Sequence, residues 1–227
     1  MVEVSTSILN IKKEDLPSVC MGLEIAKTDY FHIDVMDGKF VEKNTYEKMI
    51  ECSTYIKRLS NIPLDIHLMV EDVKAAVNDF LAFEPNVITF HLESIKIKKN
   101  GNEDKKNKVI EMIRYIRENN CKVGLSIKPN TKISEIYEFL PYINMCLIMT
   151  VEPGKGGQTF LGDMLEKIKL LKEYTKKNNI DIDIEVDGGI NLNNANKVKE
   201  AGANVLVAGT AILAAKDYKV IIDEMKK

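Results

Sequence analysis

The chain has 227 residues, of which 45% are hydrophobic and 29% are charged, so it can bury a sizeable core in one large domain or two small ones. Its formal net charge of -2 and its isoelectric point near 6.0 disfavour a nucleic-acid or anionic-membrane partner, which requires a concentrated basic face. No apolar window approaches the roughly 18 residues of a membrane span, and the N-terminus lacks the apolar core of a signal peptide, so we expect a cytoplasmic protein.

Eight short apolar or β-branched runs alternate with longer stretches of helical spacing. The runs cover residues 4–9, 31–35, 64–69, 87–91, 123–127, 145–151, 182–186 and 205–208. Each has the length of a buried parallel strand. In residues 73–83 and 164–174 the apolar side chains fall on one helical stripe. The alternation predicts an α/β fold, either a closed (β/α)8 TIM barrel or a large open sheet.

The barrel is the favoured architecture, as a single domain over residues 1–227. The strands are evenly spaced, and polar or glycine-rich residues follow several of them, which is where barrel active sites form. An open sheet instead concentrates its site at one switch point. Residues 94–108 are charged and join the fourth strand to its helix, and we expect them to form a solvated surface excursion.

Two histidines and two aspartates near strand ends are candidate metal ligands. His32 and Asp34 are two residues apart, so both side chains point to one face of a strand. His67 lies near the end of the third predicted strand, and Asp187 follows the seventh. Singly, each is more typical of a hydrogen-bonded core position or a turn, but together they form a set suited to one divalent cation. We place His91 outside this set, in a structural or supporting role.

Glycine-rich segments follow the sixth, seventh and eighth predicted strands. Their backbone amides can bind an anion, in the sector where many barrels bind phosphate. Each segment alone is equally typical of a tight turn. Ser7 ends the first strand, where its hydroxyl can contact a substrate oxygen or simply end the strand. Three methionines lie beside the proposed ligands, either as core filler or as an apolar wall: Met36, Met69 and Met149.

Taken in order, these motifs resemble the ribulose-phosphate 3-epimerase family. They read STSIL, HIDVMDGKFV, PLDIHLMVE, ITFHLE, GLSIKPNT, LIMTVEPGKGGQTF, IEVDGGI and AGANVLVAGTAI. The resemblance implies an epimerase of the pentose phosphate pathway that interconverts D-ribulose 5-phosphate and D-xylulose 5-phosphate. It also implies a homo-oligomer, either a dimer or a hexamer.

The resemblance also implies residue roles. It assigns one divalent metal per subunit to His32, Asp34, His67 and Asp187, with zinc expected and Fe2+, Mn2+ or Co2+ as alternatives. Asp34 and Asp187 match the two acid/base residues, which would move protons at C3 through a 2,3-enediolate. The expected substrate contacts are Ser7, His67, Gly154, Lys155, Gly156, Gly157, Gly188, Gly189, Ile190, Gly209 and Thr210.

Two departures from the family pattern fall in loops. Lys155 stands where the family usually has Phe, and FVEKN replaces FVPN after the second strand. Two other functions stay open at this point. One is an epimerase for a six-carbon ketose phosphate such as allulose 6-phosphate. The other is a non-catalytic phosphosugar-binding barrel, although a pure binder has no use for two opposed acids.

Overall fold

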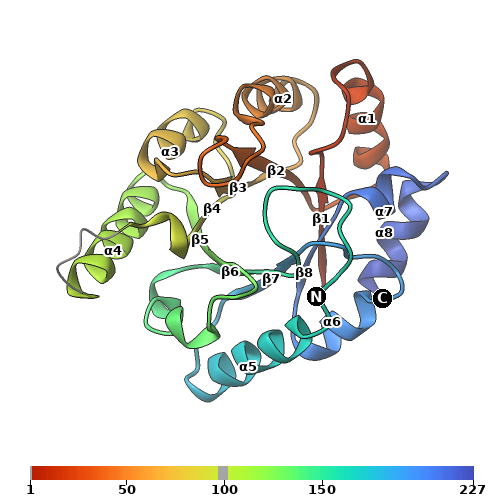
Figure 1. Ribbon diagram of the computed structural model, residues 1–227. Coiled ribbons are helices and arrows are strands. Elements are labelled where there is room, and N and C mark those ends of the chain that lie inside the picture. Colours follow the sequence, from red (N-terminus) through yellow and green to blue (C-terminus); the bar gives the residue numbers. More distant parts are fainter. Residues whose placement is uncertain (1, 97–101) are drawn as a thin grey trace.

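Eight parallel strands close into a barrel (Figure 1). The computed structural model describes residues 2–96 and 102–227. The strands follow one another around the barrel in chain order, and the last pairs with the first. They are β1 (Glu3–Ser7), β2 (Tyr30–Met36), β3 (Leu64–Met69), β4 (Val87–His91), β5 (Lys122–Ile127), β6 (Met145–Met149), β7 (Asp183–Asp187) and β8 (Val205–Ala208). The expected TIM barrel is therefore confirmed.

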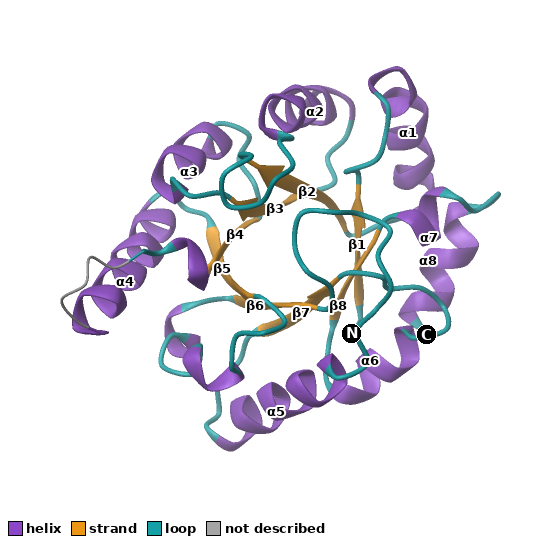
Figure 2. Cartoon of the chain, viewed as in Figure 1, coloured by secondary structure: helices purple, strands orange, loops and turns teal. Residues whose placement is uncertain are grey.

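Figure 2 shows the helices as an outer ring around the strands. They are α1 (Leu16–Ala26), α2 (Tyr46–Leu59), α3 (Val73–Leu81), α4 (Asn102–Glu118), α5 (Met164–Lys177), α6 (Ala195–Ala201), α7 (Thr210–Leu213) and α8 (Tyr218–Lys226). The 3-10 helices are η1 (Lys13–Asp15), η2 (Leu92–Ser94), η3 (Ile133–Glu135) and η4 (Leu140–Tyr142). None of the helices in the described ranges has both the length and the apolar character that crossing a membrane requires.

Two connections differ from the regular strand-helix pattern that we expected. The segment between β5 and β6 contains η3 and η4 in place of an α-helix, and prolines at 129 and 141 explain this, because proline removes a helical hydrogen bond. Helix α4 begins at Asn102, so residues 102–108 are helical rather than an irregular loop, and residues 105–108 remain at least partly exposed as expected. A buried stripe of Val109, Ile113 and Ile116 holds α4 against the barrel. Residues 97–101 lie outside the described ranges.

Alternate residues of each strand face the helices or the centre of the barrel. Ile33 and Ile66 are fully buried in the main hydrophobic core. The polar residues that alternate with these isoleucines along β2 and β3 face inward. The strand register places His32 beside Asp65 and Asp34 beside His67. In the same way, β6 and β7 pair Met149 with Asp187. The pleat therefore directs the polar residues of several strands into one interior space.

Candidate active site

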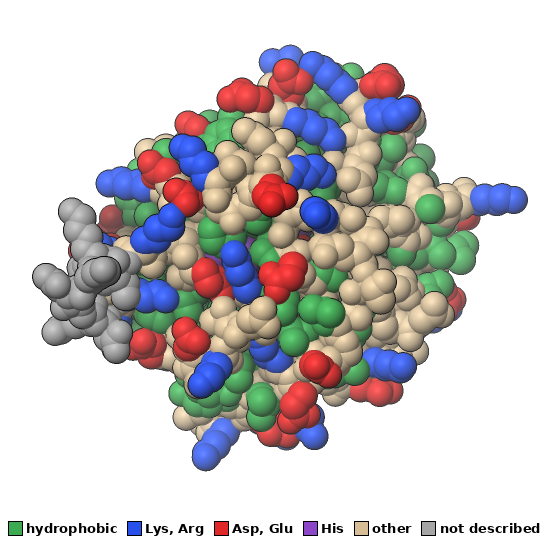
Figure 3. Space-filling view, in the orientation of Figure 1, with side chains coloured by type: hydrophobic (Ala, Val, Ile, Leu, Met, Phe, Trp, Pro, Cys, Tyr) green, Lys and Arg blue, Asp and Glu red, His purple; other side chains and the backbone are tan. Residues whose placement is uncertain are grey.

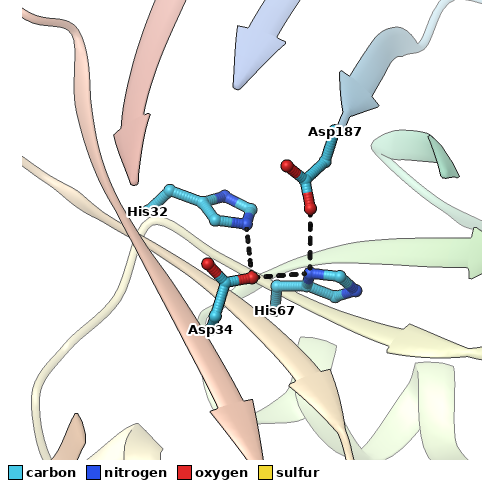
Figure 4. Close-up of side chains that lie close together, drawn as sticks. All are labelled: His32, Asp34, His67 and Asp187. Atoms are coloured by element: carbon cyan, nitrogen blue, oxygen red, sulfur yellow. Dashed lines mark hydrogen bonds and ion pairs between the residues drawn. The ribbon is translucent and has the colours of Figure 1, made fainter. Parts of the chain in front are cut away.

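Four side chains from three strands meet near the carboxyl ends of the strands (Figure 4). His32 and Asp34 come from β2, His67 from β3 and Asp187 from β7. Asp34 Oδ1 lies 3.3 Å from both His32 Nε2 and His67 Nδ1. Asp187 Oδ2 lies 3.8 Å from His67 Nδ1. One candidate ligand atom from each residue lies within 4.8 Å of the others, so the fold brings together the four residues that we grouped from the sequence.

The donor atoms of this cluster suit a divalent cation. In the described part of the chain, His32 Nε2 is buried and has no hydrogen-bond partner. The other ring nitrogen of His32 is 2.6 Å from Asp65 Oδ2, which turns Nε2 toward the cluster. Buried carboxylates need a compensating charge, and two imidazole nitrogens with two carboxylate oxygens match the preferences of zinc and related metals. A divalent metal can therefore bind here.

The two aspartates of the cluster differ in proton affinity. Burial by itself would raise the pKa of Asp34, but the neighbouring imidazoles of His32 and His67 hold it well below its usual range. Burial, followed by repulsion from Asp34, raises the pKa of Asp187 to about 6. The metal-free site thus favours a carboxylate at Asp34 and a much more basic carboxyl at Asp187. Environments that separate two carboxyl pKa values in this way are typical of acid/base pairs.

A second polar layer lies beneath the cluster, and the sequence analysis missed it. Asp65 and Glu185 are fully buried, two residues before His67 and Asp187 on their strands. His32 Nδ1 lies 3.9 Å from Glu185 Oε1. Burial, followed by the charge of Asp65, raises the pKa of Glu185 well above its usual value. The two-residue spacing that we used on β2 recurs on β3 and β7, and it was the signal that could have revealed this layer.

His91 lies directly behind His67, outside the four candidate ligands. The Nε2 atoms of the two rings are 2.9 Å apart, and His91 Nδ1 is 3.2 Å from Glu93 Oε2. Burial lowers the pKa of His91 to about 4. Burial opposes ionisation of Glu93, but the hydrogen bond with His91 outweighs it and lowers the pKa of Glu93 to about 2. The position of His91 fits the supporting role that we expected.

The cluster forms the floor of a cavity of about 860 Å³ at the mouth of the barrel. Asp34 and Asp187 line this cavity, whereas His32 and His67 are fully buried and do not. The acids therefore face the cavity while the imidazoles lie beneath them. A direct substrate contact by His67 stays a prediction, because its side chain is buried below the cavity surface. The three methionines also line the cavity: Met36, Met69 and Met149.

Ser7 contacts the ligand cluster through Asp34. Its hydroxyl donates a hydrogen bond of 2.9 Å to Asp34 Oδ2, and its side chain lines the cavity. The other oxygen of Asp34 faces the two histidines. The serine thus fixes the orientation of the Asp34 carboxylate and leaves its second oxygen directed at the ligand cluster.

The glycine-rich segments after β6, β7 and β8 line the same cavity. The lining residues are Gly154, Lys155, Gly156, Gly157, Gly188, Gly189, Ile190, Gly209 and Thr210. Gly188 and Gly189 have φ values of +125° and +69°, which L-residues with side chains rarely adopt. A Cβ atom on Gly189 would lie 2.6 Å from the backbone nitrogen of Phe160. Only glycine allows this close approach, so the wall after β7 presents backbone atoms to the cavity.

The loop between β6 and α5 crosses the mouth of the barrel (Figure 1). A Cβ atom on Gly154 would lie 3.0 Å from Val41 Cβ, so this loop touches the loop after β2. An isolated antiparallel bridge between Asp37 and Asn44 closes that second loop. The two departures from the family pattern therefore fall in loops that contact each other. Figure 3 shows charged side chains of both signs around the mouth.

Known proteins resemble this chain over nearly its whole length. Residues 3–213 match the model of the ribulose-phosphate 3 epimerase family. The ribulose-phosphate 3-epimerase of Escherichia coli strain K12 is 37% identical over 205 residues, which are 88% of this chain and 84% of the relative. That of Methanocaldococcus jannaschii is 35% identical over 227 residues, 100% of this chain and 91% of the relative.

A solved structure with the same fold is 3-hexulose-6-phosphate synthase from Salmonella typhimurium. It aligns with a TM-score of 0.66 at 12% identity and covers 99% of this chain and 96% of that chain. This likeness concerns the fold alone. The sequence matches, which span nearly the whole chain, go further: the chain belongs to the ribulose-phosphate 3 epimerase family of enzymes.

Proposed function

We propose that this enzyme interconverts D-ribulose 5-phosphate and D-xylulose 5-phosphate by proton transfer at C3 through a 2,3-enediolate. The observation that carries the proposal is the pair of carboxyl groups, Asp34 on β2 and Asp187 on β7, that reach the floor of one cavity. Epimerisation removes a proton from one face of a carbon and delivers a proton to the other face. It therefore needs two acid/base groups that approach the substrate from different sides.

The residues around the two acids support this chemistry. In the proposal, Asp34 and Asp187 exchange protons with C3, and Ser7 keeps the Asp34 carboxylate oriented. His32 and His67, together with the aspartates, would hold one divalent cation, zinc first, with Fe2+, Mn2+ or Co2+ as alternatives. When bound, that cation would stabilise the negative charge that develops on the substrate. The methionines along the cavity would keep water away from the reacting carbons.

The phosphate group is assigned to the glycine-rich loops after β7 and β8. These loops lie beside Asp187 on the cavity wall and expose backbone at Gly188, Gly189 and Gly209. Backbone amides can bind a phosphate without an arginine side chain. Lys155 lines the same cavity, and we propose that its ammonium group adds positive charge near the phosphate. A cavity of about 860 Å³ has the size of a small-molecule site.

A coupled assay tests the reaction and the metal together. The metal-stripped protein is supplied separately with zinc, iron, manganese and cobalt, and xylulose 5-phosphate formation is followed in D2O. We expect metal-dependent turnover and deuterium at C3 of the product. Asp34→Asn and Asp187→Asn should each lose roughly 10²- to 10⁴-fold in turnover and keep the circular dichroism of the parent. Asp223→Asn, on the exposed side of α8, is the matched control.

Three results would contradict parts of this proposal. Exchange of the C3 proton by a variant that lacks both carboxyl groups would overturn the acid/base assignment. Faster turnover of allulose 6-phosphate would reassign the substrate to a six-carbon sugar. Tight phosphosugar binding with no turnover under any metal would indicate a binding barrel.

We also propose that the chain is a single domain and works as a cytoplasmic homo-oligomer, a dimer or a hexamer. Sedimentation tests the oligomer, and cell fractionation tests the location.

A further inference from the structure

A line of three side chains, of which the two histidines are fully buried and Glu93 is partly exposed, leads from the loop after β4 to the candidate ligand His67. The Nε2 atoms of His67 and His91 are 2.9 Å apart, and His91 Nδ1 is 3.2 Å from Glu93 Oε2. The two rings are stacked, with centroids 5.1 Å apart and planes inclined by 29°. Both histidines have no exposed surface. Their hydrogen bonds are therefore made to each other and to neighbouring side chains, without competition from bulk water.

The hydrogen count allows two arrangements of this line. Each neutral imidazole carries one N–H, and two ring nitrogens at 2.9 Å share a single hydrogen. In the first arrangement, His91 Nδ1–H donates to Glu93 and His67 Nε2–H donates to His91. His67 Nδ1 then keeps its lone pair. In the second arrangement each hydrogen is on the other nitrogen of its own ring. A hydrogen then blocks His67 Nδ1, and the lone pair of His91 Nδ1 faces the Glu93 carboxylate.

Glu93 decides between the two arrangements. The Lys128 backbone N–H donates to Glu93 Oε1 over 2.8 Å, and the Thr131 hydroxyl donates to the same oxygen. These donors from the loop after β5 fix the carboxylate and leave Oε2 directed at His91. A carboxylate accepts a hydrogen bond and repels a lone pair, so it favours hydrogen on His91 Nδ1. At the other end of the line, Asp34 Oδ1 lies 3.3 Å from His67 Nδ1 and by itself would favour a hydrogen on that nitrogen, but a bound cation would take the place of that hydrogen. With the cation bound, Glu93 favours the first arrangement.

We propose that Glu93 and His91 are positioning residues that fix His67 in the tautomer whose Nδ1 is free to bind the cation. The inference rests on the metal site of the proposed function. The other histidine of that site has an equivalent support, because Asp65 Oδ2 lies 2.6 Å from His32 Nδ1 and leaves Nε2 for the cluster. The two ligands thus present opposite ring nitrogens, and each is fixed by a carboxylate behind it, directly for His32 and through His91 for His67.

The first test measures the tautomers in the zinc-loaded wild-type protein by ¹⁵N NMR of the histidine rings. We expect a pyrrole-type Nδ1 and a pyridine-type Nε2 for His91. Glu93→Gln should raise the zinc dissociation constant, because its amide can also donate to His91 Nδ1 and then favours the opposite arrangement. Glu138→Gln, in an exposed ion pair with Lys106, is the matched control. Hydrogen on His91 Nε2 in the zinc-loaded wild type would overturn the inference.

The second test measures zinc affinity by chelator competition in two variants of His91. His91→Phe keeps a ring for the contacts with His67 and Phe40 but cannot accept a hydrogen bond. We expect its zinc dissociation constant to rise about 10- to 100-fold. His91→Gln loses the ring but offers an oxygen to His67 Nε2–H, and we expect near-parental affinity. A packing role predicts the reverse order, and either that order or equal affinities would overturn the inference. Absence of zinc binding by the parent would instead overturn the metal site.

Discussion

Asp187→Asn should stabilise the metal-free protein at neutral pH although it removes turnover. Burial and the charge of Asp34 raise the pKa of Asp187 from 3.8 to about 6. Between these two pKa values the native state binds more protons than the unfolded state. The contribution of Asp187 to the free energy of unfolding is therefore fully present below pH 4 and is lost as the pH rises through 6. A shift of about two pKa units corresponds to a loss of about 3 kcal/mol in the free energy of unfolding above pH 7. Asparagine does not ionise and avoids this loss.

The assay is urea unfolding of the metal-free parent and variant between pH 4 and pH 8. The difference in unfolding free energy should be small at pH 4 and should reach about 3 kcal/mol in favour of the variant at pH 8. Zinc should then stabilise the parent much more than the variant, since a ligand that binds only the native state adds to its stability. Asp223→Asn removes an exposed carboxylate and should give no such gain. A variant no more stable than the parent at pH 8 would refute the electrostatic reasoning.

Three further predictions concern the loops around the cavity. Gly189→Ala would place a Cβ atom 2.6 Å from the backbone of Phe160, at a residue whose φ is +69°. We expect a higher KM and a free energy of unfolding lower by about 1–3 kcal/mol. An unchanged melting temperature would contradict this. Lys167 donates to three carbonyl groups in residues 128–131 over 2.5 to 3.2 Å; Lys167→Met should cost about 1–3 kcal/mol in urea unfolding and speed hydrogen exchange in that loop. Lys155→Phe should raise KM and weaken its salt dependence, because an ammonium group near the phosphate is screened by salt; if neither changes, Lys155 does not contact the phosphate electrostatically.

Local patterns in the sequence were enough to locate the strands and the main site. The short apolar runs and their spacing reflect the two-residue repeat of a strand, which needs no tertiary information. The same repeat placed His32 and Asp34 on one face, and the strand ends identified His67 and Asp187 as their partners. The proline-containing segment between β5 and β6 shows the limit of this reasoning. There the expectation of a regular unit outweighed the local signal, and η3 and η4 take the place of a helix.

Other features depend on the closure of the barrel. The charged residues Asp65 and Glu185 are typical of exposed positions in a sequence, yet both are fully buried. Asp65 comes close to His32 because β3 pairs with β2, whereas Glu185 does so because closure of the barrel brings β7 within reach of β2 across the interior. Strand periodicity places them on the same face as His67 and Asp187, but it does not tell that both approach His32, because it does not tell which strands come close across the interior.

The sequence by itself indicated the eight strands, the four candidate metal ligands and the glycine-rich segments, because a repeat or motif in its own segment marks each of them. Tertiary structure alone decided that His67 lies beneath the acids rather than against the cavity, and that His91 and Glu93 stand in line behind it. These relations join atoms on different strands and loops. The tilt and register of the closed barrel set such distances, and no single stretch of the chain contains them.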